Sequence, residues 1–228
     1  MTELASRLAS VRERIERAAR AAGRDPASVR LVAVCKRQPV SAVREAHRLG
    51  LRAFAENYAQ ELVSKARETA ALEGIEWHMI GHLQTNKARL VAPIVGTVHS
   101  IDSVHVAAEL GKRVAKLGRI VRVLIEVNVA NDEAKTGCSP QDLASVIDAV
   151  QASPALDLRG LMTMPPYSEN PATTRPFFAG LRALQTLHGG ATLLPDLSMG
   201  MSHDLEAAIA EGATMVRVGT ALFGERAS

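Results

Sequence analysis

The sequence predicts an α/β protein, a single-domain (β/α)8 TIM barrel with an extra N-terminal helix. Short β-rich runs alternate with amphipathic Ala/Leu/Arg/Glu-rich segments along 228 residues, a pattern that gives a mostly parallel sheet. Eight such runs suit a closed barrel, which commonly fills about 200 to 250 residues. The alternative is an open doubly wound sheet, which usually has a Gly-rich turn after its first strand. Here that turn, 36–39, contains no Gly.

The elements follow in order. A helix is expected over 2–22, because Leu4, Leu8, Val11 and Ile15 recur at helical spacing, and the barrel over 31–224. The predicted strands are 31–36, 53–56, 76–81, 97–101, 121–128, 157–163, 195–199 and 215–219. The predicted helices are about 40–49, 57–72, 84–92, 103–117, 140–152, 171–188 and 202–211. Expected N-caps are Ser103, Ser139 and Ser202, and expected helix-end glycines are Gly50, Gly74, Gly118 and Gly212. We expect one domain, 1–228.

Composition excludes several classes of protein. Net charge is +3, but both signs are interspersed and aromatic residues are only 3%, which argues against a nucleic-acid surface. There is no apolar run near 18 residues, so no membrane span is expected. Cys35 and Cys138 lie far apart in sequence, which favours a reducing compartment over a disulfide framework. We expect a cytoplasmic protein, a monomer or weak dimer.

Lys36 follows the apolar run 31–35, where a buried strand should give way to a loop. The chain has six lysines against twenty-one arginines, so a lysine here needs a reason that arginine cannot satisfy. An ammonium group can lose its proton when desolvated and become a nucleophilic amine. The ordinary alternative is a snorkelling lysine. If the strand alternates, Lys36 shares a face with Val32 and Val34, while Cys35 faces the other way.

Polar and small residues gather at the carboxyl ends of the predicted strands, where barrels carry function. After strand seven, 198–202 reads Ser-Met-Gly-Met-Ser and leads toward a helix near His203. After strand eight, Gly219-Thr220 opens another small turn. Barrels frequently bind phosphate between these two loops, using backbone N–H groups and helix dipoles. Ser202, Gly219 and Thr220 therefore form a predicted phosphate cradle.

Arg217 is predicted to point into the barrel, because strand alternation places Val216 and Val218 against the helices. A buried arginine needs a partner, since an unpaired interior charge is costly. Two partners remain open at this point: an interior carboxylate such as Glu126, or a ligand's ring nitrogen or phosphate.

A strand-one lysine, an interior strand-eight arginine and a phosphate cradle together describe a pyridoxal 5′-phosphate (PLP) site. The sequence resembles the pyridoxal phosphate homeostasis proteins, the single-domain relatives of the alanine racemase N-terminal barrel. The resemblance covers essentially the whole chain. The matching stretches are Ala33 to Lys36, Glu56-Asn57-Tyr58, Trp77 to Lys87, Gly160-Leu161-Met162, Leu197 to Ser202 and Met215 to Gly224. Departures include Cys35, Arg37 and Gln38, where such proteins more often carry Ser, Thr and Lys, and Ala55, where Gly is usual.

The resemblance implies PLP held as an aldimine on Lys36, with Arg217 facing the pyridine nitrogen, and with Asn57, Ser202, Gly219 and Thr220 as further cofactor-binding residues. It implies a role in vitamin B6 and amino-acid homeostasis without appreciable catalysis, and apo PLP-dependent enzymes as recipients. Alanine racemase adds a second domain with a tyrosine base, which we expect to be absent here because the chain stops soon after Gly224.

Two alternatives stay open: a weak PLP-dependent amino-acid racemase and, with less support, a Schiff-base phosphosugar aldolase. The aldolase would need an acid/base near Lys36 and would leave Arg217 without a task. His78 and His82 have helical metal-ligand spacing but lie on a predicted strand, so no metal is expected. Asn57 and His82 are each open to contact with the cofactor or to helix capping.

Overall fold

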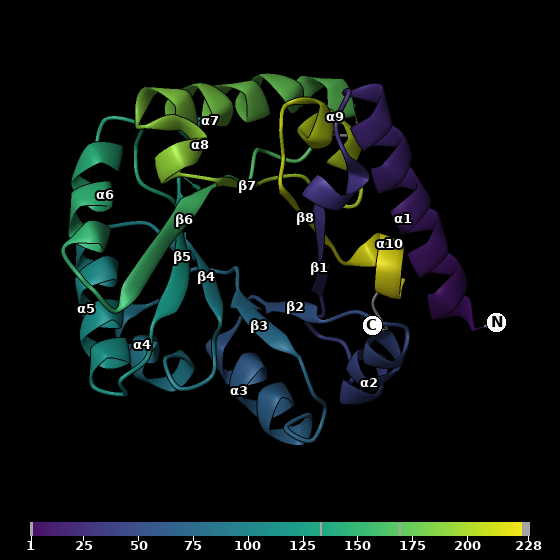
Figure 1. The fold of residues 1–228 in the computed structure, drawn as a ribbon, viewed down its shortest axis with the longest axis horizontal. Helices are drawn as coiled ribbons and strands as arrows, with labels where there is room; N and C mark the ends of the chain where they lie inside the picture. The colour runs from purple at the N-terminus through teal and green to yellow at the C-terminus, as the bar shows by residue number, and fades with distance from the viewer. Residues whose placement is uncertain (1, 133, 169, 225–228) are drawn as a thin grey trace.

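Eight parallel strands close into a barrel in the order β1 to β8, with β8 paired to β1 (Figure 1). The structure is a computed structural model that describes residues 2–132, 134–168 and 170–224. The strands are β1 (Arg30–Val34), β2 (Ala53–Glu56), β3 (Glu76–Met79), β4 (Thr97–Ile101), β5 (Val121–Glu126), β6 (Leu156–Met162), β7 (Asp196–Ser198) and β8 (Met215–Val218). The predicted (β/α)8 barrel is confirmed.

Helices surround the barrel (Figure 1). They are α1 (Glu3–Ala21), α2 (Val40–Arg48), α3 (Ala59–Glu68), α4 (Thr85–Val91), α5 (Val104–Ala115), α6 (Leu143–Gln151), α7 (Arg175–Leu187), α8 (Gly190–Leu193), α9 (Leu205–Ala210) and α10 (Thr220–Phe223), with 3₁₀ turns η1 (Pro26–Ser28) and η2 (Pro171–Thr173). None of the described helices is long and apolar enough to cross a membrane.

Element boundaries differ from expectation where side chains or turns decide them. β1 ends at Val34, two residues early, because the chain turns there toward the mouth of the barrel. Ser103 caps α5 as predicted, accepting the Val106 N–H at 3.3 Å. The Ser139 prediction is wrong: α6 begins at Leu143, and the Ser139 hydroxyl instead accepts the N–H of the N-cap residue Asp142.

Two apolar layers are separated by the strands. The outer layer, between strands and helices, includes Ala33 and Cys35. The inner cluster is small: Val32, Val34, Ala53, Ala55, Ile80 and Met215. The expected alternation of β1 is therefore confirmed, and side chains that follow the inner face of β1 lead to the barrel mouth.

Helix α1 contacts α9 and α10, and it lies beside both in Figure 1. Its buried stripe is Leu4, Leu8, Val11, Ile15 and Ala19. Arg14 pairs with Glu206 at 2.7 Å and also donates to the Ser202 carbonyl oxygen at 2.9 Å. The extra helix thus fixes the loop that follows β7.

Candidate functional site

One cavity of about 340 Å³ at the barrel mouth brings together all six predicted site residues, Lys36, Asn57, Ser202, Arg217, Gly219 and Thr220. Its other lining residues are Val34, Ile80, Met164, Tyr167, Met201 and His203. They come from the carboxyl ends of β1, β2, β3, β6, β7 and β8. This end is where functional groups of such barrels converge.

A buried ion pair supports the turn that carries Lys36. Lys65 of α3 donates to the Cys35 carbonyl oxygen at 2.6 Å and to Glu56 Oε1 at 2.5 Å. Glu61 accepts the Arg37 N–H at 2.9 Å. Arg37 has a φ of 59°, in the left-handed region that costs a non-glycine residue about 1 kcal/mol or more. These contacts hold Lys36 between two anchored neighbours.

The Lys65–Glu56 pair is almost fully buried, with side-chain exposures of 7% and 0%. Burial lowers the pKa of Lys65, but the hydrogen bond and charge of Glu56 raise it more, so the net pKa lies above its usual value. The Cys35 thiol lies 3.2 Å from the same Glu56 oxygen. Burial, first, and the charge of Glu56 raise the pKa of Cys35 well above its usual value, so this thiol stays protonated.

Arg217 points into the barrel interior and is 2% exposed. Its Nη1 donates to both the carbonyl and the hydroxyl oxygen of Ser198 at 2.7 Å, and its Nη2 donates to the Thr163 carbonyl at 2.9 Å. Glu126 is not its hydrogen-bonding partner; that carboxylate accepts from Thr136 at 2.7 Å. The direct hydrogen-bond partners of Arg217 are neutral oxygens, and Glu126 acts on the guanidinium only through its charge. Burial lowers the pKa of Arg217 to about 10, which leaves it charged at neutral pH.

Ser202 joins the two loops of the predicted cradle. Its hydroxyl accepts the Ala221 N–H at 3.2 Å, across from the loop after β8. The expectation that Ser202 caps a helix is wrong, because α9 begins at Leu205 and its N-cap residue is Asp204. The Asp204 carboxylate accepts the Met201 N–H at 2.7 Å. A Cβ at Gly219 would lie 3.3 Å from the Val34 carbonyl oxygen, a tight contact that a side chain could make only if the neighbouring backbone moved slightly.

Asn57 lines this cavity and carries an unused acceptor: its Oδ1 is buried and has no hydrogen-bond partner in the described part of the chain. Arg217 likewise keeps N–H groups beyond those it donates to Ser198 and Thr163. A buried polar atom without a partner is costly. A polar ligand with donors and acceptors of its own satisfies both.

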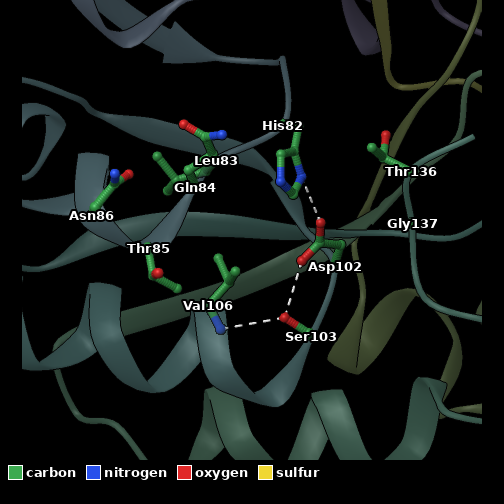
Figure 2. A pocket seen from close by; sticks show the side chains of 10 residues that line it. All are labelled: His82, Leu83, Gln84, Thr85, Asn86, Asp102, Ser103, Val106, Thr136 and Gly137. Atoms are coloured by element: carbon green, nitrogen blue, oxygen red, sulfur yellow. Dashed lines mark hydrogen bonds and ion pairs between the residues drawn. The ribbon is translucent and has the colours of Figure 1, made fainter.

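A larger cavity, of about 670 Å³, lies over the ends of β3 and β4. In Figure 2, His82 and Asp102 point toward one another, with Thr136 and Gly137 nearby. His82 Nδ1 lies 2.9 Å from Asp102 Oδ2, and Ser103 donates to the other Asp102 oxygen at 3.1 Å. His82 does not line the cavity that contains Lys36, called the Lys36 cavity below. Asn57 and His82 both line a third cavity.

His78 and His82 diverge, since His78 turns inward to His99 while His82 bonds Asp102. Among residues 2–132, 134–168 and 170–224, no group of three or more His, Cys, Asp or Glu side chains is placed to hold a metal ion. Both cysteines are free and buried, and burial raises the pKa of Cys138 to about 12.

The sequence model described as the alanine racemase N-terminal domain matches residues 6–227. The chain belongs to this family. A pyridoxal phosphate homeostasis protein of Pseudomonas aeruginosa is 48% identical over 227 residues, 99% of this chain and 97% of the relative. The protein of the same name from Aquifex aeolicus is 44% identical over 222 residues, 96% of this chain and 97% of the relative. The resemblance noted from the sequence motifs is confirmed.

Solved structures of the family share the barrel. PipY of Synechococcus elongatus, solved with PLP bound, is 38% identical with a TM-score of 0.84, covering 97% of this chain and 100% of PipY. An alanine racemase of Clostridium difficile is 14% identical with a TM-score of 0.74, covering 99% of this chain and 57% of the racemase. The latter likeness shows the fold alone.

Sequence reasoning missed Lys65 and Glu56 as the support of the Lys36 turn. The available signal was the scarcity of lysine, because Lys65 is one of only six in the chain. Its position inside an amphipathic helix resembles an ordinary solvated charge, and only the packing of α3 against β2 and β3 reveals its burial.

We predict that Lys65→Met lowers the free energy of unfolding by about 3 kcal/mol, because it leaves the Glu56 carboxylate buried without its cation. Urea denaturation measures this loss. The double variant Lys65→Met/Glu56→Gln removes both charges and should recover about half of it. Equal losses in the single and double variants would contradict the ion-pair interpretation.

Proposed function

We propose that the protein binds PLP in the Lys36 cavity, carries it as an aldimine on Lys36 and acts in vitamin B6 and amino-acid homeostasis without appreciable catalysis. Residues 1–228 act as one PLP-binding domain in this proposal. The observation that carries it is the convergence of Lys36, a buried arginine and the loops after β7 and β8 on one cavity. The PLP-bound PipY structure and the name of the curated relatives support it.

Each lining residue has a task in this proposal. PLP supplies an aldehyde that condenses with a primary amine and a ring that takes up electron density. Lys36 provides the amine. Ser202, Gly219 and Thr220 hold the phosphate through hydroxyl and backbone N–H groups. Arg217 donates to the ring nitrogen, and Asn57 Oδ1 accepts from a donor of the ligand.

The chemistry of Arg217 favours a carrier over an enzyme. The guanidinium remains charged at neutral pH and can only donate, so it favours an unprotonated ring nitrogen. A ring in that state is a weak electron sink. An open mouth with an accessible Lys36 suits transfer of the cofactor, and we propose apo PLP-dependent enzymes as its recipients.

A weak racemase is the second candidate, because Tyr167 lines the same cavity as Lys36 and carries a hydroxyl of the kind that a second base would need. Its side chain packs against His203, with ring centroids 5.0 Å apart. Tyr167 is 72% exposed, however, so water surrounds most of its side chain.

Lys36→Ala should abolish the visible absorption of the PLP-loaded protein, because no other lysine among the described residues lines the cavity. The fold should stay intact. The measurement is an absorption spectrum before and after borohydride reduction, followed by peptide mapping. Lys87→Ala is the matched control, since Lys87 lines the neighbouring cavity and should be dispensable. A reduced adduct on Lys87 or Lys135 would refute the assignment.

Ser202→Ala and Thr220→Val should weaken PLP binding by roughly tenfold each, about the loss of one charge-assisted hydrogen bond. Unphosphorylated pyridoxal should lose much less, because it has no phosphate to hold. Fluorescence titration of both ligands measures the difference. Equal losses for the two ligands would show that these residues do not contact a phosphate.

L-Alanine added to the PLP-loaded protein in deuterated water should change the absorption spectrum or release cofactor without placing deuterium on the α-carbon. An amino acid can compete with Lys36 for the aldehyde without forming a carbanion. Mass spectrometry of the recovered alanine measures deuterium. Rapid incorporation that disappears in Lys36→Ala would establish the racemase alternative, and its loss in Tyr167→Phe would identify the second base.

A further inference from the structure

A row of buried polar side chains crosses the barrel interior beneath the Lys36 cavity. From Arg217, contact passes to the Ser198 hydroxyl at 2.7 Å, then to His99 Nδ1 at 2.8 Å. His99 Nε2 lies 2.8 Å from His78 Nδ1, and His78 Nε2 lies 3.1 Å from Glu76 Oε1. The last contact is within ion-pair distance only, because His78 Nε2 has no hydrogen-bond partner among the described residues. A cation at the mouth is thus connected to a carboxylate near the opposite end.

The carboxylate end favours one direction for the hydrogen bonds between the two ends, and the arginine end is compatible with that direction. Arg217 can only donate, so the Ser198 oxygen accepts from it and is free to give its own proton to His99 Nδ1. His99 then carries its proton on Nε2 and donates to His78 Nδ1. His78 carries its proton on Nε2, which faces the Glu76 carboxylate. The opposite direction would leave a lone pair of His78 against that carboxylate.

Burial and charge agree with this arrangement. His78 and His99 are both 0% exposed, and burial holds the pKa of each below its usual value, so both imidazoles are neutral. Burial opposes the ionisation of Glu76, but its contact with His78 and the hydrogen bonds from Thr97 and Arg30 outweigh it, so its pKa lies well below the usual range. Arg122 adds a second guanidinium at 2.9 Å. Glu76 is therefore a fixed anion.

We propose that Ser198, His99 and His78 are positioning residues that couple Arg217 to Glu76 and fix the direction in which the guanidinium presents its remaining N–H groups to the cavity. The ligand side of this inference rests on the proposed function, since the ring nitrogen of PLP is the acceptor that those N–H groups would meet. The row of contacts from Arg217 through Ser198, His99 and His78 to Glu76, called the relay below, does not depend on a ligand.

The relay gives Arg217 a defined orientation that its backbone contacts alone do not. The Ser198 and Thr163 carbonyl oxygens accept two of its N–H groups, and the Ser198 hydroxyl accepts a third. That hydroxyl is itself oriented by His99. If His99 stops accepting, the Ser198 proton loses its acceptor, and the hydroxyl that receives the third guanidinium N–H is free to rotate. Ordered buried networks of this kind are strong only when every member is satisfied.

The tautomers provide a test that needs no cofactor. Nitrogen-15 NMR of the histidine-labelled protein, with resonances assigned from single-site variants, should show His99 and His78 neutral and both protonated on Nε2. A proton on Nδ1 of either ring would overturn the proposed direction.

The second test uses PLP and an analogue whose ring nitrogen is replaced by C–H. Ser198→Ala and His99→Phe should each weaken PLP binding by roughly tenfold, equivalent to about 1.4 kcal/mol, and weaken the analogue less than twofold. Two variants are used because His99→Phe alone is more disruptive to folding. Ser100→Ala is the control: it deletes a buried hydroxyl next to His99 that bonds the Gly81 carbonyl outside the relay, and it should not alter the PLP-to-analogue ratio.

The outcomes separate this inference from the proposed function. Equal binding of PLP and the analogue by the wild-type protein would show that Arg217 does not contact the ring nitrogen and would overturn the proposed coupling to the ligand. The histidine tautomers would still test the relay by themselves. Wild-type protein that prefers PLP, together with Ser198→Ala and His99→Phe variants that keep the same preference, would overturn the relay and leave the proposed function in place.

Discussion

Closure of the barrel between β8 and β1 is the constraint on which the candidate site depends. In that pairing Val32 lies opposite Arg217 and Ala33 opposite Val218, so the two strands end at the same level. Lys36, two residues beyond β1, therefore meets Gly219 and Thr220, which come from the other end of the sequence. The close approach is visible at Gly219, where any side chain would press on the Val34 carbonyl. A shift in register would separate the amine from both the arginine and the cradle.

Two buried ionic arrangements flank this junction, one on each side of the sheet. Lys65 and Glu56 lie outside the barrel, beneath α3, and anchor the Lys36 turn through the Cys35 carbonyl. The relay from Arg217 to Glu76 lies inside. Buried charges contribute little net stability, because desolvation offsets their attraction. Their value here is geometric, since the first anchors the backbone of the Lys36 turn and the second includes the Ser198 hydroxyl that contacts Arg217.

The remaining part of the cavity is set by packing between elements distant in sequence. Helix α1 contributes Arg14, which donates to the Ser202 carbonyl and so reaches the loop after β7. Ser202 in turn accepts from Ala221 at the start of α10. The N-terminal helix is thereby coupled to both loops of the proposed phosphate cradle. An element that appears to be an appendage in the sequence contributes to the geometry of the mouth.

Local sequence patterns determined the fold and the membership of the site. Alternating β and α segments predicted the barrel, and the two-residue period of β1 and β8 placed Lys36 and Arg217 on the inner face. Because strand ends of a parallel barrel converge, residues named only by their strand positions line one cavity. The tertiary structure decided the partners. Ser202 bonds another loop instead of capping a helix, Arg217 bonds neutral oxygens instead of Glu126, and His78 faces His99. Those choices depend on side chains that meet across strands far apart in sequence, where small differences in distance and direction select the hydrogen bond and no periodic pattern records them.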